Sequence, residues 1–141
     1  MDKRLTLQLI PALERATHSV ALWIERTFAD LRLTQAEAHA LAALSELTPC
    51  SINGLHHRFG HKRSTLTSLL DRLEGRGWVR RGAHPISRRL VLVELTEDGR
   101  LIADRTRSAV RELEGRLLSH LDSADMAAFA RVLFALEEEV R

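Results

Sequence analysis

Residues 60–81 read GHKRSTLTSLLDRLEGRGWVRR, and this stretch decides the fold. Its four central leucines recur three to four residues apart, which predicts a helix from about Arg63 to Arg76 with one buried face (Leu66, Leu69, Leu70 and Leu73). Gly77 then ends the helix. Beyond it the apolar period changes to two, which predicts a strand over Trp78–Arg81.

The segments on either side complete a recognisable unit. Leu90–Leu95 predicts a second strand, joined to the first by a loop over residues 82–87. Before the central helix, Asn53 is the expected N-cap of a short helix that runs to Phe59, and Gly60 ends it. Two helices joined by a tight turn and followed by a hairpin predict a winged helix-turn-helix.

Longer amphipathic helices are expected outside this unit. One covers about Pro11–Leu31, and a second begins at Thr34, where Glu37 would complete a capping box. Thr96 and Ser123 are the expected N-caps of the last two helices. The fold class is therefore mainly α (α+β).

We expect one structural domain with two functional parts. Residues 33–99 would form the winged helix-turn-helix lobe, and residues 1–32 and 100–141 the dimerisation helices. Four large aromatic residues on the terminal helices lack enough partners within one subunit, which favours a homodimer (Trp23, Phe28, Phe129 and Phe134).

Composition limits the class of protein. The chain has 141 residues, of which 45% are hydrophobic and 28% are charged, as in a globular helix-rich protein. The single cysteine, Cys50, cannot form an internal disulfide, so a reducing compartment fits. No 18-residue apolar run exists, so we expect no membrane span and a cytoplasmic location.

Charge is strongly segregated along the chain. Residues 56–90 contain nine Lys and Arg but only two acidic residues, a net charge of +7, so the rest carries −5 within the total of +2. A surface that binds a polyanion requires such segregation. The candidate DNA-binding residues combine these cations with small hydrogen-bonding side chains: Lys62, Arg63, Ser64, Thr65, Thr67, Ser68, Arg72, Arg88 and Arg89. Lys62 stands where a helix N-terminus disfavours a cation, which indicates a role in phosphate contact.

Three stretches together resemble the MarR family: LTQAEAHALAALSE (33–46), residues 60–81 quoted above, and RRLVLVELTEDGR (88–100). The resemblance implies a homodimeric, ligand-responsive transcription regulator, expected to be a repressor, on a pseudo-palindromic operator of double-stranded DNA. It implies that the 63–76 helix enters the major groove and that Arg89, in the wing, reaches the minor groove. It also implies a small aromatic or phenolic effector. Family members commonly carry Asp where this chain has Ser87, so we expect a wing that is mobile without DNA.

Weaker candidates remain open. His18, Trp23 and Arg26 could line an effector pocket, although a Trp on such a helix is more often dimer core. The histidines near residue 57 lack the spacing of a metal site, and Cys50 is more simply an inert thiol than a redox sensor. No catalytic constellation is present, so we expect no enzyme, no cofactor and no metal. The alternative function is a winged-helix protein-interaction module that does not bind DNA.

Overall fold

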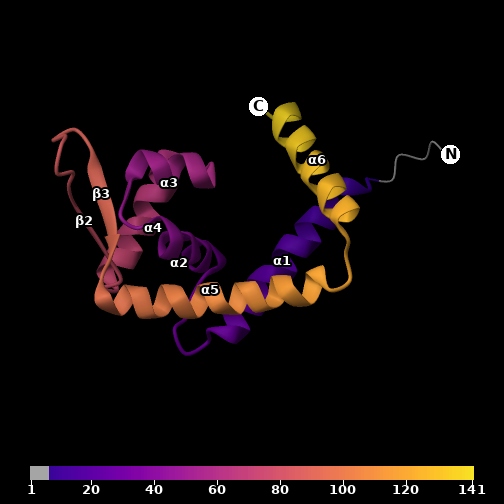
Figure 1. The fold of residues 1–141 in the computed structure, drawn as a ribbon, viewed down its shortest axis with the longest axis horizontal. Helices are drawn as coiled ribbons and strands as arrows, with labels where there is room; N and C mark the ends of the chain where they lie inside the picture. The colour runs from indigo at the N-terminus through magenta and orange to yellow at the C-terminus, as the bar shows by residue number, and fades with distance from the viewer. Residues whose placement is uncertain (1–6) are drawn as a thin grey trace. The chain divides into compact units, whose positions relative to one another are not determined.

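The computed structural model describes residues 7–141, in which the chain forms helices and a small sheet (Figure 1). Their order is α1 (Leu9–Thr27), α2 (Gln35–Leu47), β1 (Cys50–Ser51), α3 (Ile52–Phe59), α4 (Arg63–Gly75), β2 (Val79–Ala83), β3 (Val91–Leu95), α5 (Glu97–Leu118) and α6 (Ser123–Glu139). This confirms the predicted order of helices and hairpin. The first six residues of the predicted 1–32 dimerisation segment lie outside the described residues. None of the described helices combines the length and the apolar character needed to cross a membrane.

The chain divides into two compact units, one up to Thr106 and one from Arg107 on. The first unit contains the sheet, whose strand order is β1-β3-β2 with antiparallel pairs. The β2–β3 pairing runs from Val79 opposite Leu95 to Ala83 opposite Val91. Strand β1, which the sequence analysis did not predict, pairs Cys50 with Val93 and so joins the start of α3 to the hairpin.

A single apolar core lies between the helices and the sheet of this first unit. The predicted inward leucines of α4 are all buried, and α4 packs against α2 and β2, while α2 and α3 pack against β3. The buried residues of these elements include Leu41, Leu44, Leu55, Leu66, Leu69, Leu70, Leu73, Val79 and Val93. Each fully buried leucine contributes about 1.5–3 kcal/mol through removal from water. This core therefore holds α4 by its inner face alone.

Several predicted helix starts need correction. Asn53 is not the N-cap of α3, because Ser51 Oγ accepts the Gly54 N–H at 3.0 Å. Ser123 is not the N-cap of α6, because Asp122 forms a full capping box with Asp125. Thr34 does cap α2, but Glu37 does not complete the box, since its carboxylate binds two arginines instead. Thr96 accepts the Gly99 N–H at 3.0 Å, as predicted.

The end of the first helix also differs from the prediction. Helix α1 stops at Thr27, four residues before the predicted Leu31. Phe28 follows it and is only 1% exposed, within the core of its own unit. Phe28 therefore does not need a dimer partner, and the reasoning that counted it among the partnerless aromatics is wrong.

A buried carboxylate fixes α4 against α2. The side chain of Glu37 is 5% exposed and accepts hydrogen bonds from Arg72 Nε at 3.3 Å and Arg76 Nη1 at 3.1 Å. Arg76 also donates to the carbonyl of Leu31 and stacks over the Trp78 ring, with its Cζ 4.0 Å from the centroid. A carboxylate removed from water loses its hydration, and charge-assisted hydrogen bonds of this kind compensate for that loss. We call this set of contacts the Glu37 clamp.

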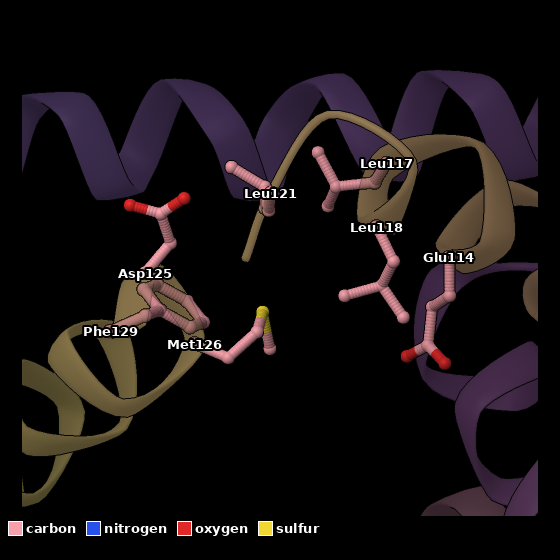
Figure 2. A pocket seen from close by; sticks show the side chains of 7 residues that line it. All are labelled: Glu114, Leu117, Leu118, Leu121, Asp125, Met126 and Phe129. Atoms are coloured by element: carbon pink, nitrogen blue, oxygen red, sulfur yellow. The ribbon is translucent and has the colours of Figure 1, made fainter. Parts of the chain in front are cut away.

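The second unit contains the end of α5 and all of α6. Between them lies an apolar groove of about 450 Å³, in which Leu118 of α5 faces Met126 and Phe129 of α6 (Figure 2). Two further leucines, Leu117 and Leu121, complete its apolar wall. Several of these side chains are substantially exposed, as is Phe134 at 65%. Such a contiguous apolar surface marks a site where another surface packs.

We predict that Glu37→Gln lowers the free energy of unfolding by about 1–3 kcal/mol, because a neutral amide cannot satisfy two guanidinium groups as a buried carboxylate does. Glu94→Gln is the matched control, since Glu94 meets only the exposed Arg80 at 3.1 Å. An exposed pair contributes about 0–1 kcal/mol. Denaturant unfolding at equal protein concentration measures both, and equal losses in the two variants would contradict a special role for Glu37.

Candidate nucleic-acid interface

Helix α4 presents a polar outer face opposite its buried leucines. Ser64, Thr65, Thr67 and Ser68 are all exposed, as the amphipathic pattern predicted. Their hydroxyl groups both donate and accept hydrogen bonds, and their small size lets a groove wall approach the helix closely. This face therefore suits contact with the edges of base pairs.

The start of α4 is left open to a negative charge. Gly60 turns the chain with a φ of 65°, which costs glycine little, and donates its N–H to the His56 carbonyl at 3.0 Å. Lys62 then occupies the N-cap without a side-chain hydrogen bond, and no acidic residue lies in the first turn. The positive end of the helix dipole lies at the same place as the exposed side chains of Lys62 and Arg63. All of these positive charges favour an anion there.

The loop that joins β2 to β3 forms the wing, and hydrogen bonds within the loop shape it. His84 N–H donates to the Leu90 carbonyl at 3.1 Å, and Leu90 N–H donates to the Ser87 carbonyl at 3.2 Å. Ser87 Oγ accepts the backbone N–H of Arg89 at 3.4 Å, but it offers that residue no negative charge. Arg88 and Arg89 are exposed on this loop. The predicted mobility of the wing without DNA stays a prediction.

Ion pairing divides the nine basic residues of the segment into two groups. Four are paired: Arg72 and Arg76 with Glu37, Arg80 with Glu94, and Arg81 with Asp71 and Glu74 at 2.5 and 2.7 Å. These carboxylates raise the pKa of Arg81, chiefly through its hydrogen bonds to Glu74 and Asp71. The other five have no carboxylate partner within residues 7–141: Arg58, Lys62, Arg63, Arg88 and Arg89. The unpaired positive charge therefore lies on α3, the start of α4 and the wing.

Arg72 differs from the other predicted DNA-binding residues. Its Nε is held by Glu37, while its side chain remains 51% exposed. The guanidinium group has further N–H donors that Glu37 does not use. A contact between Arg72 and DNA remains a proposal. The sequence did not predict that Arg72 binds the buried carboxylate of Glu37. The signal was present in Glu37, an acidic residue whose helical position shares the buried face with Leu41 and Leu44.

The weaker candidates are dispersed. Cys50 lies in β1, and burial raises the pKa of its thiol, which makes the reactive thiolate scarcer. His39 packs against Phe59, which also lies near His61, with ring centroids 5.0 and 6.1 Å apart. Burial, followed by the charges of His61 and Arg58, lowers the pKa of His39. Among the described residues, no three or more His, Cys, Asp or Glu side chains come together as metal ligands.

The predicted effector residues do not share one face of α1. His18 and Arg26 are exposed, and Trp23 is half-buried. Trp23 lies five positions after His18, which places the two side chains about 140° apart around a helix. An effector site at these residues would therefore need groups from other elements.

Comparison with known proteins agrees with this geometry. Residues 33–91 match the family model described as "MarR family". The HTH-type transcriptional regulator PecS of Dickeya dadantii is 28% identical over 135 residues, which cover 94% of this chain and 81% of PecS.

Two solved structures extend the comparison. The fold is similar to that of MepR from S. aureus in complex with DNA, with a TM-score of 0.82 and 17% identity over 96% of this chain and 100% of MepR. It is also similar to a mutant MarR from E. coli complexed with operator DNA, with a TM-score of 0.70 and 25% identity over 91% of this chain and 94% of MarR. Residues 33–91 thus carry the match to the MarR family, and the similarity to PecS and to these two folds extends over nearly the whole chain.

Proposed function

We propose that this protein is a transcription regulator that binds a specific double-stranded DNA operator as a homodimer. The observation that carries the proposal is the position of the unpaired cations. Lys62, Arg63, Arg88 and Arg89 flank the hydroxyl-rich face of α4, while four of the five other arginines in the segment are paired with carboxylates. Positive charge beside a small polar face is what phosphate contact and base reading require together.

In this mechanism α4 enters the major groove, which is about 12 Å wide and admits one helix. Ser64, Thr65, Thr67 and Ser68 then reach base edges, and Lys62 contacts the backbone near the start of the helix. Arg72 keeps Glu37 and uses its remaining donors toward a phosphate. The wing, with Arg88 and Arg89, lies at the adjacent minor groove.

The dimer supplies the second half-site contact. The exposed apolar groove of α5 and α6, together with Phe129 and Phe134, favours a second copy as its cover. Two recognition helices one DNA turn apart require half-sites about 34–36 Å apart, and hence a pseudo-palindromic operator. DNA binding that responds to an aromatic or phenolic effector, near His18, Trp23 and Arg26, completes the proposal of a ligand-responsive repressor.

The outer face of α4 also discriminates against the alternative function. A winged-helix module that binds only protein would be expected to expose large apolar side chains on this face. Among the residues of α4, the large apolar ones are the four buried leucines, and the exposed ones are hydroxyl-bearing, charged or Gly75. This composition favours DNA.

We predict that the protein selects a specific duplex from a random library, and that its affinity falls by roughly 10³–10⁵ between 50 and 200 mM salt if about six to ten phosphates are neutralised. Arg89→Ala should weaken binding by about 1–3 kcal/mol per site, while Thr65→Ala should relax base preference. Fluorescence anisotropy on the selected duplex measures both variants. Arg80→Ala is the control, because Glu94 already neutralises Arg80. Failure to select any duplex would remove DNA binding from the function.

We predict a dimer at micromolar concentration that Phe129→Glu weakens, because a charge in the apolar groove would lose its hydration when the second copy packs. Arg131→Glu, an exposed change on the same helix, should leave the dimer intact. Sedimentation equilibrium gives the mass of each variant. A wild-type mass of 15.9 kDa at every concentration would rule out the dimer.

A further inference from the structure

A small pocket lies where α3, α4 and the wing meet. Its volume is about 220 Å³, and four of its lining residues have polar side chains: Ser51 and Asn53 around the start of α3, Arg63 at the start of α4, and Arg89 at the end of the wing loop. Ile52, Leu90 and Val91 contribute apolar walls. No acidic residue lines the pocket.

The positive charge of the two arginines is not balanced by any acidic residue of the pocket lining. Neither Arg63 nor Arg89 has a carboxylate partner in the part of the chain that the structure describes. Both line one small volume. By contrast, Arg80 and Arg81, on the strand that leads into the wing, are each held by a carboxylate. An anion bound in this pocket would therefore meet two positive side chains that no carboxylate of the chain neutralises.

Ser87, which lies two residues before Arg89, carries no charge that could neutralise the Arg89 side chain. Its hydroxyl accepts the backbone N–H of Arg89 at 3.4 Å, so it contacts the backbone of this residue without neutralising its side chain. An Asp at this position would bring a carboxylate to the same place. In this chain, the wing arginine is left available for a second ligand.

We propose that this pocket binds one phosphate-class oxyanion, shared by Arg63 and Arg89, and that in the DNA complex the oxyanion is a backbone phosphate. The inference rests on the proposed function and deepens it, because it assigns the Arg89 guanidinium to a phosphate rather than to a base edge. Guanidinium groups bind phosphate oxygens through paired N–H donors, so two of them can hold one phosphate from two sides. One phosphate would then tie the start of α4 to the base of the wing.

The first test is whether the two arginines act on the same phosphate. Arg63→Gln, Arg89→Gln, the double variant and the control Arg80→Gln are compared by anisotropy on the selected duplex, each checked for folding by circular dichroism. Each neutralised phosphate contributes about 0.9 to the slope of log K against log salt. If the phosphate is shared, the double variant should lower the slope of log K against log salt by about 0.9 per half-site. Its loss of affinity should also be smaller than the product of the losses in the two single variants. A reduction of about 1.8 with multiplicative losses would overturn the proposal.

The second test begins with the wild-type protein and locates the phosphate. Neutral methylphosphonate linkages are introduced one at a time along the selected duplex. We expect one position in each half-site at which neutralisation weakens wild-type binding but leaves the affinity of the double variant unchanged. If every position affects wild type and double variant equally, the shared phosphate does not exist. The proposed function would survive that result, because it fails only if the wild-type protein selects no duplex.

A third arm distinguishes a DNA phosphate from a free one. Inorganic phosphate is titrated into the wild-type protein by calorimetry at constant ionic strength, without DNA. Saturable binding of inorganic phosphate by the wild type, absent in the double variant, supports the oxyanion pocket if the methylphosphonate scan also finds a position that depends on the two arginines. No detectable binding, together with a positive scan, assigns the site to the DNA backbone alone. Binding of free phosphate with a negative scan would overturn the assignment to DNA.

Discussion

The position of α4 depends on the ion pairs that the buried carboxylate of Glu37 makes with Arg72 and Arg76. The leucine core fixes only the inner face of that helix, and an apolar face by itself permits small sliding and rotation. Glu37 contacts Arg72 and Arg76, which lie one turn apart near the C-terminal end of α4, so it restrains the helix along its axis and about it. Because Glu37 has been removed from water, any movement that breaks these bonds leaves an unsatisfied buried charge.

The same contacts reach beyond α4 to the segment that follows α1. Arg76 donates to the Leu31 carbonyl, and on this segment Asp30 also pairs with Arg105 of α5 at 2.7 and 3.0 Å. Arg105 in turn lies over the ring of the buried Phe28, with its Cζ 5.3 Å from the centroid. The hydrogen bond from Arg105 lowers the pKa of Asp30. Residues 28–31 are therefore attached both to the recognition helix and to α5, so a displacement of either helix acts on this segment.

Regular elements could be predicted from the sequence because their signals are local. Leucine spacing located α4, and a change of period after Gly77 located the hairpin. The two-residue strand β1 could not be predicted, since Cys50 and Ser51 become a strand only by pairing with β3. Likewise, Arg72 looked like a free cation, because its partner Glu37 lies 35 residues earlier and is brought near only by the fold. The sequence thus identified a basic segment, but which of its arginines are paired with carboxylates required the tertiary structure.

Three departures from local rules lie at the start of α4 and in the wing. Helix α4 begins at a lysine N-cap without a side-chain hydrogen bond, although a Ser or Asp there would stabilise it by about 1 kcal/mol. The first turn adds Arg63 against the helix dipole, and Ser87 leaves Arg89 without a charge partner. Four other helices have side-chain caps, because Thr34, Ser51, Thr96 and Asp122 each accept a backbone N–H, whereas Gln8 before α1 makes no such bond. Of the two helices without a side-chain cap, α4 alone adds basic side chains at the uncapped end, where α4 and the wing would meet the DNA backbone. A common external anion accounts for the uncapped lysine, the first-turn arginine and the unpaired wing arginine together.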